Sequence, residues 1–291
     1  MGFMTLFMAG LAHGSLYALV ALGLVLIYKT QGIVNWAHGE LLMVGAFSGY
    51  TAFVLAGLPY PLAFLVAVLA GALLGALMER IAFRGIVHEH HATLALVAIG
   101  FSVIIKGVAR IPFGADVYTL PPALPDAAPL RFAGAIVTSQ SALTIAISVG
   151  ITLLLLAIFR YTRTGKQMQA TQQNLNGARI VGINTGRIFS ITWALAAAVG
   201  AIAGLLAGPI SLLYPDMGSE FLLKGFAAAV LGGFHSVTGA IVGGLLVGVI
   251  EMLIGGYVST AFQQVSPFLI IIIVLFVRPH GLFGRRPVER V

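Results

Sequence analysis

The feature that most constrains this chain is a series of apolar runs, each long enough to cross a lipid bilayer as a helix. A bilayer core requires about 20 apolar residues of helix. Eight such runs lie at residues 3–28, 33–56, 61–83, 92–111, 136–159, 187–208, 238–256 and 260–277, and a shorter one lies at 221–234. The pattern predicts an all-α, polytopic transmembrane helix bundle of about eight apolar segments, which forms a single transmembrane domain over residues 1–291.

Composition excludes a soluble globular protein. Of the 291 residues, 59% are hydrophobic and only 9% are charged, whereas soluble domains carry about 25% charged residues. The chain has no cysteine, which excludes disulfides, thiolate nucleophiles and cysteine metal sites. The run at 3–28 is too long for the apolar part of a signal peptide and no basic region precedes it, so we interpret it as the first helix.

Basic residues gather at particular ends of the apolar runs. The net charge is +7, but this placement matches the cytoplasmic faces of membrane helices and not a nucleic-acid surface. The groups expected in the cytoplasm are Lys29, Arg80, Arg84, the basic residues of 160–187, and the tail residues Arg278, Arg285, Arg286 and Arg290. Residues 112–135 are rich in proline and contain Asp116 and Asp126, so we expect them outside.

The region 221–256 is expected to contain a broken or re-entrant helix. Arg187 and the tail are both expected in the cytoplasm, so the chain must cross the membrane an even number of times between them. Three long apolar runs and one short run lie in this stretch. The short run at 221–234 is therefore expected to enter from outside, and the run at 238–256 to return outward. Residues suited to a turn lie between these runs, at Gly232, Gly233, Ser236 and Gly239. Broken helices of this kind mark transport pathways, because irregular backbone at membrane depth must line a cavity or be buried in protein.

Ionisable residues inside apolar runs are expensive in lipid and are candidate pathway residues. Asn35 and His38 share one helix face, which predicts a polar substrate pathway, although they also suit a helix end near the headgroups. Glu40 points away from that face and is expected to pair with a neighbouring helix or to lie near the interface. Lys106 and Lys224 do not fit the charge rule for membrane loops.

Two further polar residues are candidates for the pathway. His13 lies four residues before Tyr17 and either lines the pathway or forms an interhelical hydrogen bond. Glu251 lies deep in the run at 238–256 and is either a pore-lining group or half of a buried pair.

The sequence offers little for catalysis. The run His88-Glu89-His90-His91 lacks the i, i+4 histidine spacing of a zinc helix and is interpreted as a solvated loop, so no metal site is predicted. The sequence contains no phosphate-binding P-loop, so the chain is not expected to hydrolyse ATP by itself. No catalytic residue and no cofactor are predicted.

The segment 160–187 is the least membrane-like part of the chain. Its residues predict two short helices, the second capped by Asn174 or Asn176. Such an elbow suits docking to a soluble partner, and the alternative is an ordinary loop. The residues proposed for coupling to a partner are Arg163, Lys166, Gly177, Ala178, Arg179 and Gly182.

Several motifs in chain order resemble those of one family. They are GLVLIY at 23–28, GIVNWAHGEL at 32–41, ARIVGIN at 178–184, AAVLGG at 228–233 and RPHGLFGR at 278–285. Together they resemble the LivH-type permeases of branched-chain amino-acid ABC importers. His235, and the uncharged residues 171–174 of the elbow, differ from the usual family pattern.

The resemblance implies a function and a set of partners. It implies a multi-pass permease of the bacterial cell inner membrane that translocates branched-chain or related amino acids with ATP hydrolysed by partner subunits. The implied partners are a second, LivM-like permease, two cytoplasmic ATPases and a periplasmic substrate-binding protein. Similar permeases serve urea, short amides and aromatic acids, so the substrate stays open.

Two other functions remain as alternatives. One is a secondary transporter or channel for small polar solutes such as urea and amides, acting without ATPases. The other is a membrane-embedded enzyme that uses the histidines of residues 88–91, or His38 with Glu40.

Overall fold

The computed structural model describes residues 2–86, 89–125, 127–132 and 134–284 of the chain. His88, Asp126, Arg285, Arg286 and Arg290, which entered the predictions above, lie outside the described residues. The helices are α1 (Phe3–Gln31), α2 (His38–Tyr50), α3 (Tyr60–Met78), α4 (His91–Phe113), α5 (Ser139–Tyr161), α6 (Arg163–Gln173), α7 (Leu175–Ile180), α8 (Thr185–Ala207), α9 (Met217–Gly232), α10 (Val237–Tyr257) and α11 (Thr260–Val277). Two π-helical turns, η1 (Thr51–Leu55) and η2 (Glu79–Phe83), extend α2 and α3.

The prediction of a polytopic helical bundle is confirmed. Among the described residues, 7 helices are long and apolar enough to cross a membrane, namely α1, α3 with η2, α4, α5, α8, α10 and α11. Helix α2 with η1, and helix α9, are shorter and lie within the bundle. The chain is therefore a multi-pass membrane protein.

Two predicted boundaries are wrong by several residues. The apolar run expected to be helical from residue 33 becomes helical only at His38, because the Asn35 side chain accepts a hydrogen bond from the Ala37 N–H at 3.0 Å and forms a local turn instead. The run expected from residue 136 begins as a strand. Here β1 (Leu130–Phe132) pairs antiparallel with β2 (Ala135–Val137), and α5 starts only at Ser139.

Helix α1 is a central element of the bundle and packs closely against α10. A Cβ atom on Gly10 would lie 2.7 Å from the Val249 Cα, and one on Gly14 would lie 2.8 Å from the Leu245 Cα. Because residue numbers rise along one helix as they fall along the other, the two helices are antiparallel. Small residues allow this approach, and close packing replaces the hydrophobic effect as the attraction between helices in lipid.

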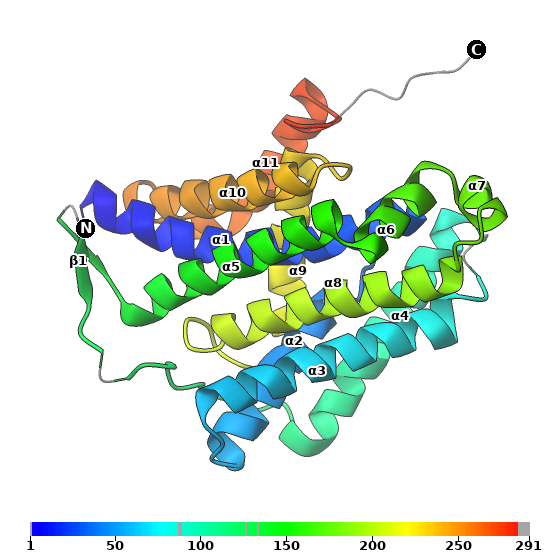
Figure 1. Ribbon diagram of the computed structural model, residues 1–291. Helices are drawn as coiled ribbons and strands as arrows, with labels where there is room; N and C mark the ends of the chain where they lie inside the picture. Colours follow the sequence, from blue (N-terminus) through cyan, green and yellow to red (C-terminus); the bar gives the residue numbers. More distant parts are fainter. Residues whose placement is uncertain (1, 87–88, 126, 133, 285–291) are drawn as a thin grey trace.

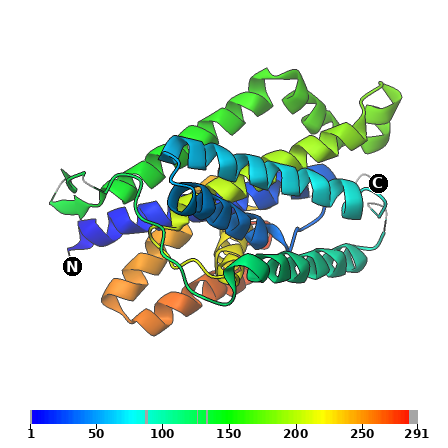
Figure 2. The same ribbon diagram turned by 90° about the horizontal axis from the view of Figure 1, so that it is seen from below.

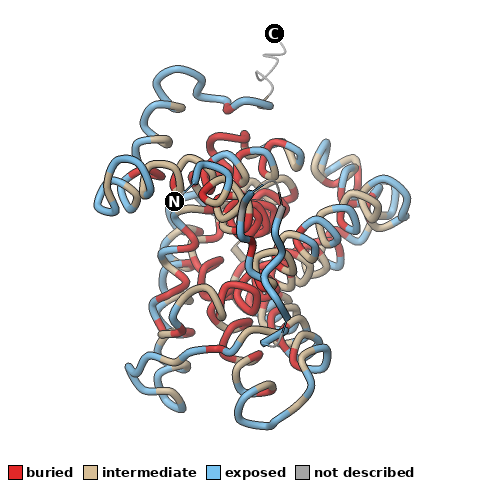
Figure 3. The backbone as a smooth tube through the Cα atoms, turned by 90° about the vertical axis from the view of Figure 1, so that its left-hand side faces the viewer, coloured by how far each residue is buried: buried red, intermediate tan, exposed pale blue. Residues whose placement is uncertain are grey.

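Glycine residues of α3 also lie at close contacts, with α8. A Cβ atom on Gly71 would lie 2.5 Å from the Ala201 Cβ, and one on Gly75 would lie 2.6 Å from the Trp193 carbonyl oxygen. Helix α8 is therefore antiparallel to α3. Helices α1 and α8 are mostly buried, whereas α4, α5 and α11 are mostly exposed at the periphery. Figure 3 shows this buried centre, and Figure 2 shows α9 in the middle of the bundle.

The two ends of the bundle differ in chemistry. The elbow helices α6 and α7 lie at one end, on the right of Figure 1. We call it the basic end, and its basic residues are Lys29, Arg80, Arg84, Arg160, Arg163, Lys166, Arg179, Arg187 and Arg278. The opposite end, the loop end, carries the N-terminus and the hairpin β1–β2. There the segment after α4 meets the segment after α8 through the paired residues Tyr118 and Leu213.

The expected break near 221–256 is present between α9 and α10. Helix α9 ends at Gly232, and Gly233 has a φ of 97°, a value that favours glycine. The Ser236 side chain caps α10 by accepting the Gly239 N–H at 2.9 Å. This turn lies at the basic end, because the His235 ring is 5.2 Å from the Tyr28 ring and the Leu282 N–H bonds the Leu231 carbonyl at 2.8 Å.

Candidate functional site

The most unusual feature of the bundle is a pair of charge clusters on the two sides of α9. The first, the α4 cluster, consists of Glu40, Ser102, Lys106, Arg110, Asp216 and Ser219. The second, the α10 cluster, consists of His13, Tyr17, Glu220, Lys224 and Glu251. Charged groups are costly at membrane depth unless they are paired, so their concentration around one short helix indicates a functional site.

The α4 cluster joins three helices. The Lys106 ammonium lies 3.4 Å from a Glu40 carboxylate oxygen and 3.5 Å from an Asp216 oxygen, and it donates to the Ser219 hydroxyl at 2.8 Å. The Glu40 side chain is 1% exposed. Arg110 forms the outer part of the cluster, 2.7 Å from Asp216, and both side chains are half exposed.

The α10 cluster joins α9 to α10 and α1. The Lys224 ammonium lies 2.8 Å from a Glu220 oxygen and 2.9 Å from a Glu251 oxygen. It also lies 5.5 Å from the centre of the Tyr17 ring, within cation–π range. The His13 ring is 6.4 Å from the Tyr17 ring, so two of the pathway candidates, His13 and Glu251, belong to the cluster around Lys224.

Sequence reasoning did not select Lys106 and Lys224 as site residues. The signal was present, because both lysines break the charge rule for membrane loops. Their partners lie far away in the sequence: Glu40 with Lys106, and Glu251 with Lys224. Glu40 therefore pairs with a neighbouring helix, one of the two arrangements expected for it.

Asn35 and His38 lie apart from both clusters. His38 is fully buried, and its ring lies against Gly200, where an added Cβ atom would be 3.4 Å from the His38 Nε2. Neither ring nitrogen has a hydrogen-bond partner among the described residues. The pathway role of Asn35 and His38 stays a prediction.

The elbow at the basic end has the expected two short helices. The Thr162 hydroxyl caps α6 by accepting the Gly165 N–H, and the Asn174 side chain caps α7 by accepting the Gly177 N–H at 2.8 Å. Asn184 then caps α8 through the Arg187 N–H. Side-chain capping of three successive helices gives this segment a defined structure.

The tip of the elbow is apolar and exposed. Ile180 is 85% exposed and Val181 is 73% exposed, although both lie beyond the apolar helices. Of the residues proposed for coupling, Ala178 is buried beneath this tip, whereas Arg163, Lys166, Arg179 and Gly182 are exposed and Gly177 is partly buried. Gly182 has a φ of 81°, so the chain turns there from the tip toward α8.

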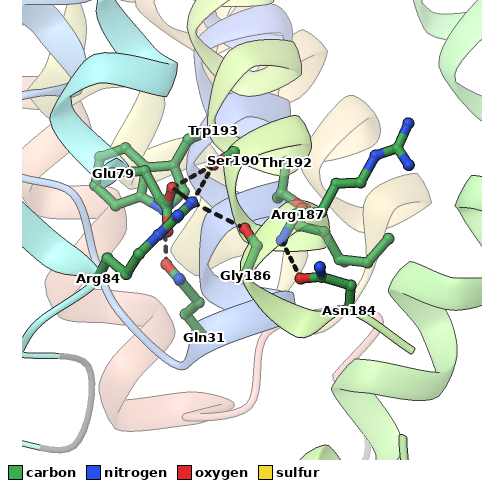
Figure 4. Close-up of polar contacts among 10 residues, drawn as sticks. Gln31, Glu79, Arg84, Asn184, Gly186, Arg187, Ser190, Thr192 and Trp193 are labelled. Carbon is green, nitrogen blue, oxygen red and sulfur yellow. Dashed lines mark hydrogen bonds and ion pairs between the residues drawn. The ribbon is translucent and has the colours of Figure 1, made fainter. Parts of the chain in front are cut away.

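A polar clamp connects the start of α8 to the end of α3, as Figure 4 shows. The Arg84 guanidinium binds both carboxylate oxygens of Glu79, at 2.8 and 3.2 Å, and also the Gly186 carbonyl at 3.2 Å. Ser190 donates to the same carboxylate. The Trp193 indole N–H donates to the Gln31 side chain at 2.6 Å and adds α1 to the connection.

The electrostatics of the clamp favour a charged Arg84. Its hydrogen bonds with Glu79 and the negative charge of that carboxylate raise the pKa of Arg84. Glu79 is fully buried, so the bidentate pair compensates a charge that would otherwise be unfavourable. The clamp therefore connects the exit of the elbow to α3 and α1 by direct side-chain contacts.

Metal chemistry has no support in the part of the chain that the structure describes. No group of three or more potential metal-binding side chains is present among these residues. Glu89 and His90 precede α4 at the basic end, His91 is the first residue of that helix, and His88 is outside the described residues.

The fold and the buried charges define a class of protein before any comparison is made. A multi-pass bundle with a broken element, paired charges beside it and a structured elbow at one end has the features of a membrane transporter. The fold is shared with a solved structure, described as PsaBC from Streptococcus pneumoniae in complex with Fab. The TM-score is 0.51, the sequence identity is 16%, and the match covers 96% of this chain and 93% of that chain.

Sequence comparisons identify the family. The chain is 33% identical to the high-affinity branched-chain amino acid transport system permease protein LivH of Salmonella typhimurium, over 97% of this chain and 96% of that protein. It is 30% identical to the corresponding BraD protein of Pseudomonas aeruginosa, with the same coverage. The model of the family described as branched-chain amino acid transport system / permease component matches residues 6–277, and the chain belongs to this family.

Proposed function

We propose that this chain is the membrane-spanning permease subunit of an ABC importer for branched-chain or related amino acids. Family membership and the names of the relatives support the substrate class. The buried charges around α9 suit a substrate that carries both a positive and a negative group. ATP hydrolysis takes place in partner subunits.

The observation that carries this proposal is the exposed apolar tip of the elbow. Ile180 and Val181 are among the more exposed apolar side chains of the structure, and the helices around them are capped rather than loose. An apolar surface at an aqueous end of a membrane protein favours a protein partner. The clamp of Glu79, Arg84 and Ser190 provides the mechanical link from this tip into the bundle.

The proposed assembly follows from this assignment. The basic end faces the cytoplasm of a bacterial cell, the membrane is the inner membrane, and two ATPases dock at the elbows of two permeases. The second permease is LivM-like. A periplasmic substrate-binding protein delivers the amino acid to the loop end, where exposed residues such as Val117, Leu124 and Leu212 are available for contact.

The test uses the complex purified from its native host and reconstituted in proteoliposomes. Uptake of labelled L-leucine is measured with the binding protein outside the vesicles and ATP or a non-hydrolysable analogue inside. We expect uptake to require hydrolysable ATP. Uptake driven by an ion gradient in the absence of the ATPases would overturn the proposal in favour of a secondary transporter.

The elbow is tested by Ile180→Asp, with Leu212→Asp as the matched control. Leu212 is 54% exposed and lies in the segment after α8, at the opposite end of the bundle. The Ile180 variant is expected to insert into the membrane but to lose retention of the ATPases, while the control retains them. Ile180→Asp changes only the exposed surface, whereas any side chain at Gly182 would also strain the backbone. Equal retention by the two variants would place the coupling surface elsewhere.

A further inference from the structure

A pocket with an acid, a base and apolar walls lies between α9 and α11. Its volume is about 210 Å³. The polar lining residues are Glu220, Lys224 and Gln264, and the apolar ones are Leu223, Pro267 and Phe268. The pocket adjoins the α10 cluster through Lys224 and Glu220.

The charges around this pocket do not balance. One cation, Lys224, contacts the two carboxylates of Glu220 and Glu251. The Glu251 side chain is 4% exposed, whereas the Glu220 side chain is 53% exposed. The buried Glu251 therefore holds the ammonium in position, and the outer carboxylate of Glu220 has room to move within the pocket.

A second observation indicates spare binding capacity in the cluster. One carboxylate oxygen of Glu251 is buried and has no hydrogen-bond partner among the described residues. Buried polar atoms are normally satisfied, and unsatisfied ones occur at functional sites. Because Glu251 does not line the pocket, the carboxylate that an additional cationic group can reach from the pocket is that of Glu220.

We propose that this pocket is a subsite for the zwitterionic head group of an aliphatic amino acid on its way through the permease. Lys224 receives the α-carboxylate, Glu220 receives the α-ammonium, and Leu223 and Phe268 contact the aliphatic side chain. The proposal rests on the proposed function and extends it, because it places substrate selection in the permease as well as in the binding protein.

The required chemistry makes the subsite selective for molecules with both charges. L-Leucine satisfies Lys224 and Glu220 together. The deaminated analogue 4-methylpentanoate lacks the ammonium that Glu220 would bind, and leucinol lacks the carboxylate that Lys224 would bind. Because a hydrogen bond to a charged group contributes about 1.5–3 kcal/mol, each analogue should bind about tenfold or more weakly than L-leucine.

The absence of cysteine from the chain permits a direct measurement of occupancy. Gln264→Cys is introduced into the full complex and labelled with a small, water-soluble thiol reagent, with and without saturating L-leucine, on variants that retain uptake. Thr260→Cys, one helical turn earlier on α11 and outside the pocket lining, is the control. We expect L-leucine to slow labelling at Gln264→Cys by about tenfold, while the two analogues, and the control position, show little change.

A charge-neutral double variant separates ligand binding from structural pairing. Lys224→Met together with Glu251→Gln removes a cation and its buried partner at once, so no unpaired buried charge remains. The double variant is expected to assemble with its partners and yet to lose both uptake and the protection of Gln264→Cys. Normal uptake in this variant would show that the pair is structural only.

The outcomes distinguish this inference from the proposed function. If ATP-driven leucine uptake occurs but labelling at Gln264→Cys is unaffected by leucine, the subsite is refuted and the proposed function stands. A thiol at this position that never reacts also refutes the subsite, since no aqueous pocket then opens there. Absence of ATP-driven leucine uptake in the wild-type complex refutes the proposed function itself.

Discussion

The α4 cluster allows a quantitative prediction, because one helix carries both a buried and an exposed ion pair. Lys106→Met removes the cation from Glu40, whose side chain is 1% exposed. Arg110→Met removes the cation from the outer side of Asp216, where both partners are 50% exposed. The two substitutions lie one helical turn apart on α4 and replace the charge with a similar volume, so each is a control for the other.

The expected destabilisation differs between the two variants. Removing one partner of a buried pair costs about 3–5 kcal/mol. Protonation limits this loss, because neutralising a carboxylate of ordinary pKa, about 4.3, at pH 7 costs about 3.7 kcal/mol. The Ser102 hydroxyl still donates to Glu40, so we expect Lys106→Met to lower the free energy of unfolding by about 3 kcal/mol. The exposed pair of Arg110 contributes about 0–1 kcal/mol.

The assay is reversible unfolding of the purified permease in mixed micelles with a rising fraction of denaturing detergent, followed by circular dichroism. Lys106→Met combined with Glu40→Gln should recover most of the loss, because both charges are then absent and Ser102 keeps an acceptor. Equal destabilisation by Lys106→Met and Arg110→Met, or no recovery in the double variant, would refute the burial argument.

Three further predictions concern packing, topology and the buried histidine. Gly14→Leu should prevent close approach of α1 and α10 and reduce the yield of folded protein. Gly150→Leu is the control and should be tolerated, because a Cβ atom added there meets nothing within 4 Å. Equal yields of the two variants would contradict the packing argument. A single cysteine at Leu124 should react with an impermeant reagent on intact cells, and one at Gln173 only after permeabilisation, so identical labelling would reject the proposed orientation. His38→Leu should assemble normally and lower leucine uptake several-fold in proteoliposomes, and unchanged uptake would assign the buried ring to packing alone.

The relation between sequence and site is clearest at the charged residues. For Glu40 the sequence left open a pairing with a neighbouring helix or a position near the interface, because an isolated charge is costly in lipid. For Glu251 the sequence allowed two interpretations, a pore-lining group or one half of a buried ion pair. In the structure Glu251 contacts Lys224, and Lys224 also contacts Glu220 four residues earlier on the same helix. Only the contact of Lys224 with Glu220 follows from local sequence spacing, because residues four apart on a helix are neighbours.

The sequence by itself determined the helical segments of this protein, because each depends on local properties. Runs of about 20 apolar residues have no stable alternative to a helix in lipid. The break after Gly232 and the capped elbow also depend on neighbouring residues, such as Ser236 for α10 and Asn174 for α7. The boundary at residue 33 failed because a side-chain turn at Asn35 opposes the helix that the apolar pattern predicts.

The tertiary structure alone decided which helices meet and therefore which charges pair. Lys106 on α4 reaches Glu40 on α2 and Asp216 beside α9, because packing between segments far apart in the chain, such as the contact of α2 with α9 at Gly39 and Gly218, brings these residues together. The pocket between α9 and α11 exists for the same reason, since its acid and base come from α9 and its outer wall from α11. Periodicity places residues on a helix face, but the contacts of that face depend on packing between segments far apart in the chain.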